Sequence, residues 1–207
     1  MIGFTIISGA YFKVANDLRE LARSGLNDRP GHFYVFPSIA MYMAAFEAFI
    51  QEHLAYSRYS VMRSDRPNTA RELVKLDALK NQSGDYKVFK TWVKEVYRAY
   101  DQTGCGIDVN GAEYHDLLAL KELRNSVVHY NPLFIEVASW PARLEQVLRR
   151  TKIEALNAGW VMNFSNSTVA DWAHDSTKAC VQLFCRISGA QDPFQVVLER
   201  DGMPPWE

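Results

Sequence analysis

Hydrophobic residues recur every three or four positions along most of the chain, whereas the strict alternation of a half-buried strand is scarce. This spacing is typical of α-helices. Residues 1–13 are apolar without such a period, so we expect a strand or an irregular lead-in there. A first helix is predicted over residues 13–25, with Val14, Leu18 and Leu21 facing the core and Gly25 ending it.

The most regular pattern predicts a long second helix over residues 37–62, which begins at Pro37 with Ser38 as a cap. Its opening turns are apolar nearly all round, which indicates the central helix of a bundle. Its apolar stripe consists of Ile39, Tyr42, Phe46, Phe49, Ile50 and Leu54.

Further helical patterns cover residues 70–80, 86–100, 112–130, 141–159 and 167–189. In the pattern at 112–130 the inward residues are Leu117, Leu120, Leu123 and Val127, and in the last they are Trp172, Ala179, Leu183 and Phe184. The chain is therefore predicted to be one all-α domain, a bundle of about six helices. We divide it into a lead-in with the first helix (1–34), the bundle (35–190) and a surface tail (191–207).

The overall charge and the cysteines restrict the function classes. The formal net charge is −1, whereas a dedicated non-specific nucleic-acid binder is usually far more basic, so nucleic acid would have to bind a local patch. Three cysteines without CxxC spacing indicate reduced thiols in a cytoplasmic protein. The longest stretch without charged residues, 30–46, contains two prolines, a glycine and a histidine. We interpret it as a buried helix start and not as a membrane span.

Common catalytic motifs are absent from the sequence, which has no GxSxG, Walker A, GxGxxG, HExxH or EF-hand pattern. Two His-Asp dipeptides resemble those of helical metal phosphohydrolases of the HD type, and His53, His115, Asp116 and Asp171 follow the order of such ligands. However, an Asp near a helix start is favoured by the helix dipole alone. We therefore expect neither a metal nor another cofactor.

The segment "LRNSVVHY" carries the strongest candidate chemistry, in Arg124, Asn125 and His129. Cleaving RNA without a metal requires a general base for the ribose 2′-hydroxyl, and imidazole suits this because its pKa lies near neutrality. It also requires a cation against the phosphorane, which a forked guanidinium provides. A neutral amide can orient either group.

Helix geometry limits how these three residues act together. Asn125 and His129 are i,i+4 neighbours, whereas Arg124 and His129 lie about 140° apart on an ideal helix. They converge only if the helix distorts, if the arginine wraps round, or if a second chain completes the site across a two-fold axis; we prefer the dimer. The competing structural interpretation is a helix end whose polar residues suit the dipole, closed by Asn131 and Pro132.

The same segment resembles the signature of the HEPN superfamily, in which an arginine and a polar residue are followed, after three residues, by a histidine. The apolar helix around "FEAF" is similar to a Glu-bearing helix of those domains, and the resemblance extends over about residues 35–190. It implies a HEPN-like helical bundle that pairs as a homodimer, either a metal-independent ribonuclease of toxin–antitoxin, phage-defence or RNA-processing systems or a non-catalytic binding module. It further implies that His129 is the general base or acid, that Arg124 stabilises the phosphate and that Asn125 fills the polar position.

Two supporting residues follow from this interpretation. Glu47 lies in the apolar second helix, where a carboxylate is costly unless paired, so it either binds Arg124 or points to solvent. Some HEPN toxins carry a tyrosine two residues after the histidine, but here Asn131 stands at that position. Tyr130, one residue earlier, is therefore a weaker candidate.

Basic residues next to tyrosines form a candidate RNA surface, because arginines contact phosphates and aromatic rings stack on bases. The surface consists of Arg58, Arg63, Arg66 and Arg71, near Tyr56 and Tyr59. A second basic stretch contains Arg143, Arg149, Arg150 and Lys152. A solvated helix face explains either stretch equally well. The expected partners are RNA, a second copy of the chain that completes the active site, and an antitoxin or other protein; no membrane is expected.

Overall fold

The structure, a computed structural model, describes residues 7–25, 30–62, 111–128, 142–153 and 160–188, with side chains left out at 53–62, 142, 143, 160, 184 and 186–188. These residues form six helices and no strand, which confirms the all-α bundle. The helices predicted at 70–80 and 86–100 and the tail from 191 lie outside the described ranges.

Helix α1 (Ser8–Ser24) begins earlier than expected. The prediction of a strand or irregular lead-in as far as residue 13 was therefore wrong for residues 8–13. The carboxylate of Glu52, on α2, accepts hydrogen bonds from the backbone N–H groups of Ile7 and Ser8 and from the Ser8 hydroxyl. These bonds satisfy N–H groups that a helix start leaves without partners, and local sequence cannot reveal a cap that lies 44 residues away. The helix stops as predicted at Gly25, which adopts a positive φ of 71° and donates to the Leu21 carbonyl.

The buried face of α1 is not the predicted one. Val14 is 44% exposed, and Leu18 and Leu21 are only partly buried. The adjacent stripe is buried instead; it consists of Ser8, Gly9, Phe12, Ala15, Arg19 and Ala22. Its small residues let α1 approach its neighbours closely, and the burial of Arg19 becomes tolerable only through the carboxylates around it.

Helix α2 (His32–Met62) begins five residues before the predicted start, and Pro37 lies inside it. A proline there removes one backbone hydrogen bond, to the carbonyl of Phe33. Ser38 is not a cap either: it is buried, and its hydroxyl donates to the Ala15 carbonyl of α1. The early start places the predicted boundary between residues 34 and 35 within a helix.

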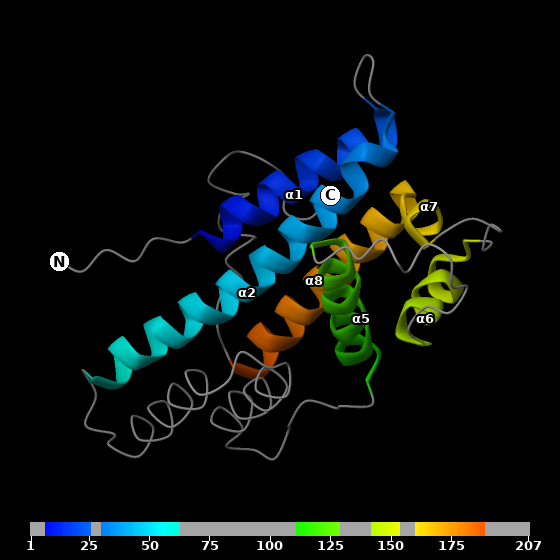
Figure 1. Cartoon of the computed structure of the whole chain (residues 1–207). Coiled ribbons are helices and arrows are strands. Elements are labelled where there is room, and N and C mark those ends of the chain that lie inside the picture. Colours follow the sequence, from blue (N-terminus) through cyan, green and yellow to red (C-terminus); the bar gives the residue numbers. More distant parts are fainter. Residues whose placement is uncertain (1–6, 26–29, 63–110, 129–141, 154–159, 189–207) are drawn as a thin grey trace.

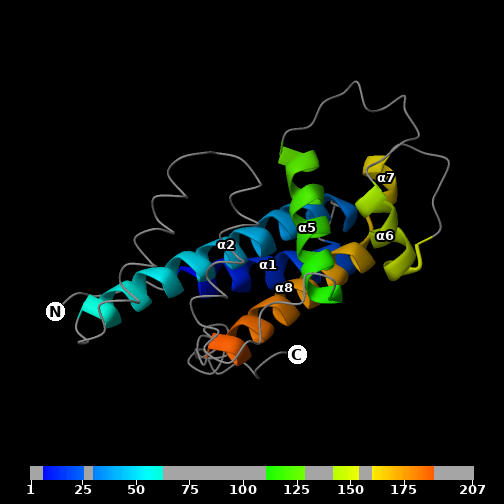
Figure 2. The ribbon, with the colours of Figure 1, turned by 90° about the horizontal axis from the view of Figure 1, so that it is seen from below.

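Four further helices complete the bundle (Figures 1 and 2). They are α5 (Ala112–Val128), α6 (Ala142–Thr151), α7 (Trp160–Phe164) and α8 (Ser167–Ser188). Helix α2 packs against α1, α5 and α8, and α6 packs against α5 and α8. Helix α8 also contacts α1 and α5. The expectation that the second helix is central is therefore confirmed.

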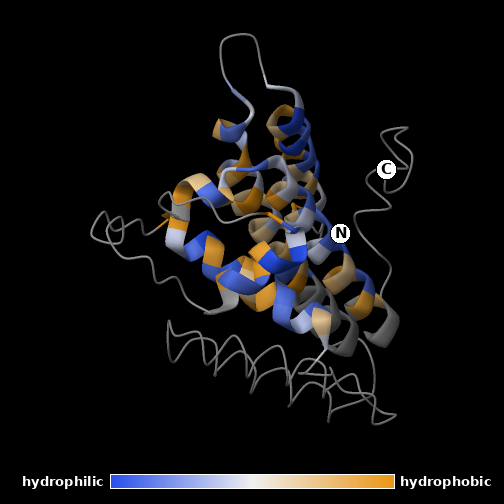
Figure 3. Cartoon of the chain, turned by 90° about the vertical axis from the view of Figure 1, so that its right-hand side faces the viewer, coloured by the Kyte–Doolittle hydropathy of each residue, from blue (hydrophilic) through white to orange (hydrophobic). Residues whose placement is uncertain are grey.

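The core follows the predicted stripes of α2 and α5 closely. Ile39, Tyr42, Phe46, Phe49 and Ile50 are buried on α2, and Leu117, Leu120 and Leu123 are buried on α5. Val127 is only partly buried, and the side chain of Leu54 lies outside the described part. Figure 3 shows hydrophobic and hydrophilic residues following each other along the helices, as expected of amphipathic helices that bury one side. On α8, Trp172 is buried as predicted, whereas Ala179 and Leu183 are only partly buried.

Helix α6 is shorter than the pattern over 141–159 predicts. It ends at Thr151, because Lys152 takes a left-handed φ of 56° and the N–H of Ile153 donates to the Leu148 carbonyl. That bond is the one that closes a Schellman motif. A lysine at the left-handed position gives no sequence signal, since glycine is the residue usual there.

By length and composition alone, His32–Glu52 of α2 is long and apolar enough to cross a membrane. Half of its most apolar stretch is buried inside the structure. The core helix of a soluble protein and a signal sequence pass the same test.

The turn between α1 and α2 generates a prediction. A Cβ placed on Gly31 would lie 2.3 Å from the carbonyl oxygen of Ala22, a backbone atom of α1. We expect Gly31→Ala to lower the free energy of unfolding by about 1–3 kcal/mol, because the two helices must separate locally. Urea denaturation measures this, with Met162→Ala at an exposed position as a control that changes stability by less than about 0.5 kcal/mol. Equal stability of Gly31→Ala and the parent chain would contradict the close approach.

Candidate functional site

The described part of the candidate site joins α5 to α2. Arg124 lies four residues before the end of α5, and its Nη2 donates to Oε1 of Glu47 on α2. The side chains are 22% and 39% exposed, respectively. Of the two alternatives for Glu47, the structure shows the pairing with Arg124. An ion pair of this exposure remains accessible from solvent while both groups are partly shielded from it.

Asn125 follows Arg124 on α5 and is half-buried. Helix α5 is regular as far as Val128, so Arg124 and Asn125 project about 100° apart around its axis. His129 and Tyr130 lie outside the described residues. The structure therefore shows Arg124 in contact with Glu47. A contact between Arg124 and His129 stays a prediction.

The candidate RNA surface falls almost wholly outside the described ranges. Arg58 belongs to α2 but its side chain is not described, and Arg63, Arg66 and Arg71 follow the end of that helix. In the second basic stretch, Arg149 is exposed and pairs with Glu145 within α6, at 3.6 Å. Arg150 pairs with Asp116 on α5. Neither arrangement by itself distinguishes a nucleic-acid surface from a solvated helix face.

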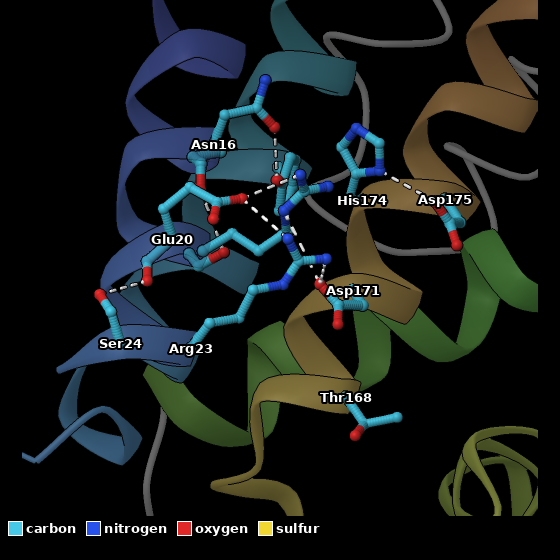
Figure 4. Close-up of polar contacts among 12 residues, drawn as sticks. Asn16, Glu20, Arg23, Ser24, Thr168, Asp171, His174 and Asp175 are labelled. Atoms are coloured by element: carbon cyan, nitrogen blue, oxygen red, sulfur yellow. Dashed lines mark hydrogen bonds and ion pairs between the residues drawn. The ribbon is translucent and has the colours of Figure 1, made fainter. Parts of the chain in front are cut away.

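A second polar cluster, which the sequence did not suggest, joins α1 to α8 (Figure 4). Asp171 Oδ1 lies 2.7 Å from Arg23 Nη2 and 3.7 Å from Arg19 Nε. Glu20 Oε1 accepts from both arginines, at 3.1 Å from Arg19 and 3.0 Å from Arg23. Arg19 is only 6% exposed. Two carboxylates thus balance two guanidinium groups, and the charge of Arg19 is not left unpaired in the interior.

His174 lies beside this cluster on α8, with only 4% of its surface exposed. Its ring lies 5.6 Å from that of Phe12 and 5.7 Å from that of Tyr42, between centroids. Burial lowers the pKa of His174, and the hydrogen bond between its Nδ1 and Asp175 Oδ1, at 2.9 Å, opposes that shift only in part. Burial also disfavours the charged form of Tyr42 and so raises its pKa. The Tyr42 hydroxyl donates to Asn16 Oδ1 at 2.7 Å. At neutral pH both rings are therefore uncharged.

The residues considered for an HD-type metal site have other partners. Asp116 pairs with Arg150, and Asp171 pairs with Arg23 and Arg19. His115 is half-buried on α5 and packs edge-on against Tyr114, while the His53 side chain is not described. Within the part of the chain that the structure describes, no three His, Cys, Asp or Glu side chains come together as metal ligands.

The described cysteines are packed thiols. Cys180 and Cys185 are both free, and Cys180 is buried against α5, where its Sγ donates to the Glu113 carbonyl at 3.2 Å. Burial raises the pKa of Cys180 to about 12. A thiol that stays protonated at neutral pH is a poor nucleophile, so Cys180 acts as a small packing residue.

One sequence signal would have located the α1–α8 cluster. Phe12, Ala15, Arg19 and Ala22 are spaced 3, 4 and 3 residues apart, which is a regular helical stripe interrupted by one arginine. Val14, Leu18 and Leu21 are the larger hydrophobic residues, so the sequence prediction placed their stripe, next to the buried one, in the core. Only the position of Asp171, 152 residues away from Arg19, shows why the arginine is tolerated inside.

Comparison with known protein families, characterised proteins and solved structures found no match to this chain. The resemblance to HEPN domains therefore rests on the residues quoted above.

The charge balance at Arg19 generates a prediction. Asp171→Asn removes a carboxylate that serves two arginines, one of them buried, so we expect unfolding to require about 3 kcal/mol less free energy. Asp17→Asn is the matched control: Asp17 is an exposed carboxylate of α1 paired with Lys13 at 3.8 Å, and its loss should cost less than about 1 kcal/mol. Chemical denaturation at pH 7 measures both, and similar losses for the two variants would rule out a buried charge balance.

Proposed function

We propose that this chain is a metal-independent endoribonuclease of the HEPN type, with His129 as general base and acid and Arg124 as the stabiliser of the phosphate. The observation that supports this most directly is the ion pair between Arg124 and Glu47. It joins the arginine of the motif to the carboxylate of the apolar helix, the two segments on which the resemblance rests.

The pair suits the role of a positioned cation. Glu47 binds one terminal nitrogen of the guanidinium, and a guanidinium has five N–H donors in a fixed fork. Donors therefore remain for a phosphate while one side of the fork is anchored. Because the arginine is partly exposed, a phosphate can reach it without unfolding α5.

The base must come from His129, the only imidazole within the motif. On an ideal helix it lies about 140° from Arg124, so the proposal includes a homodimer in which a second copy completes the site. RNA is the proposed substrate and the cytoplasm the proposed location. An antitoxin or another protein is a further proposed partner.

A non-catalytic HEPN-like module is the second candidate. The net charge of −1 and the presence of Asn131 at the position of the tyrosine of some toxins favour it. Such a module would bind a nucleotide, RNA or a protein and use the pair of Arg124 and Glu47 only to hold α5 against α2.

The test is RNA cleavage in excess EDTA by the purified chain and by single variants. We expect His129→Ala to lower the rate by about 10²–10⁴-fold, the usual contribution of a general base. Arg124→Ala should lower it by about 10²–10³-fold, the cost of losing a group that stabilises charge in the transition state. Lys13→Ala, on α1, is the control and should cleave like the parent chain.

Each other outcome has a definite meaning. If the folded parent chain cleaves none of several RNAs, the result would support the non-catalytic module and contradict the proposed nuclease. Activity that appears only with added divalent metal would contradict the metal-independent mechanism.

Glu47→Gln provides a separate prediction for the anchor. The amide keeps the size of the carboxylate but loses its charge, so the guanidinium is held less firmly and cleavage should slow by about tenfold, less than with Arg124→Ala. Circular dichroism should show an unchanged helix content. Full activity of Glu47→Gln would show that the ion pair serves stability alone.

A further inference from the structure

The residues of α1 that were expected in the core, but lie beside it, belong to a longer row of apolar side chains. The row recurs at intervals of 4, 3, 4 and 3 positions, which is the heptad spacing of helices that pack side by side in a coiled coil. It begins directly before the helix at Ile7, whose backbone is already helical, with φ −95° and ψ −22°. We call this row the outer seam. It consists of Ile7, Tyr11, Val14, Leu18 and Leu21.

The outer seam lies next to the buried stripe of α1 and is separate from it. Each seam residue directly precedes a buried residue, as Val14 precedes Ala15, so the two rows lie about 100° apart around the helix. Ile7 and Val14 are 42% and 44% exposed, and the other three seam residues are partly buried. Single exposed apolar side chains are common, but a row of them over about four helical turns is typical of a surface that binds a partner.

The charges of α1 favour a second helix as the partner over a membrane or a nucleic acid. Apart from the buried Arg19, the helix carries two basic and two acidic side chains, Lys13, Arg23, Asp17 and Glu20. A helix that lies on a membrane surface or binds nucleic acid usually has a polar face rich in lysine and arginine. Heptad spacing, in contrast, keeps an apolar seam facing another helix along its whole length.

The charges that flank the outer seam favour a second copy of this same helix. Lys13 and Asp17 lie one turn apart on the side of the seam that is turned away from the buried stripe, and they pair loosely at 3.8 Å. Val14 is the middle of the seam. In an antiparallel pair of copies, Lys13 therefore lies within one turn of Asp17 of the partner subunit, and the arrangement is repeated by symmetry.

A parallel pair lacks this complementarity. It would place Lys13 level with Lys13 of the partner subunit, and Asp17 level with Asp17 of the partner subunit, so that like charges face each other. The formal net charge of −1 adds little repulsion between whole copies in either arrangement. The flanking charges thus select the antiparallel pair.

We propose that the outer seam is a homodimer interface, in which α1 packs against α1 of a second copy in antiparallel orientation. The two-fold axis passes near Val14, so the same five residues serve both copies. The inference is independent of the proposed nuclease, because Glu47, Arg124 and His129 lie outside α1. This contact is separate from the one that would complete the nuclease site. One helix from each copy makes a small interface, so the association should be weak and concentration-dependent.

The first test measures the mass of the full chain by sedimentation velocity, from about 1 to 200 µM. We expect the mass to rise with concentration. Val14→Glu places like charges near the two-fold axis and should raise the dissociation constant at least about tenfold. Because Val14 is 44% exposed, circular dichroism of this variant should match that of the parent chain. Met162→Glu is the matched control, at an apolar residue of α7 that is 61% exposed, and should associate like the parent.

A charge swap tests the identity and the orientation of the partner. Lys13→Asp alone sets carboxylates against each other across the seam, and Asp17→Lys alone sets ammonium groups against each other. Each single variant should weaken the association by about three- to tenfold, as expected for two exposed ion pairs turned into repulsions. The double variant, Lys13→Asp with Asp17→Lys, restores opposite charges and should recover the dissociation constant of the parent chain.

Three results would overturn the interface. One is the mass of a single chain at every concentration, which would leave the seam to a different protein or a membrane. Another is an association that Val14→Glu does not weaken, since such a dimer forms through another surface. The third is a double charge variant that associates as weakly as the single variants, because the antiparallel pairing of Lys13 with Asp17 then does not occur.

Discussion

The charge of Arg19 must be balanced inside the bundle, and much of the architecture depends on that constraint. A guanidinium is tolerated in an interior only when carboxylates satisfy it, and here Asp171 and Glu20 do so from two helices. The ion pairs fix the rotation of α1, because they select the stripe with Phe12 and Ala15 as the buried one. They also join α8 to α1 next to the hydrophobic contacts of these two helices.

The Glu47–Arg124 pair is a second ion pair between two helices of the bundle. There the carboxylate belongs to the apolar central helix and the guanidinium to α5. Both groups keep partial contact with solvent. In the cluster around Arg19 only the Arg19 side chain is closed off, at 8% exposure, while Glu20, Arg23 and Asp171 are 58%, 46% and 34% exposed. The two sites thus differ in the burial of their arginines, since the Arg19 side chain is 8% exposed and that of Arg124 is 22% exposed.

Sequence periodicity predicted the parts of the fold that depend on apolar burial. The stripes of α2 and α5 were correct because Ile39, Phe46, Leu120 and similar residues have no alternative to burial. Two of the errors arose where a polar contact between distant residues decides, because the start of α1 depends on Glu52 and its rotation on Asp171. The end of α6 depends instead on a local feature, a lysine in the left-handed conformation. For the site, the sequence identified Arg124 and gave pairing with Arg124 as one of two alternatives for Glu47, because a carboxylate in an apolar helix is costly without a partner. Whether His129 joins them depends on residues outside the described ranges.

The cap that Glu52 provides for α1 has a consequence for folding order. During synthesis the residues of α1 emerge before those of α2, but the Glu52 carboxylate that satisfies the N–H groups of Ile7 and Ser8 follows 45 and 44 residues later. Most of the stability of a helix in a protein comes from tertiary packing, so α1, with its 17 residues, gains little stability before α2 is present. Stable formation of α1 therefore awaits the chain as far as the middle of α2, and the two helices form as one cooperative unit. The first helix of the sequence is in this sense not the first to fold.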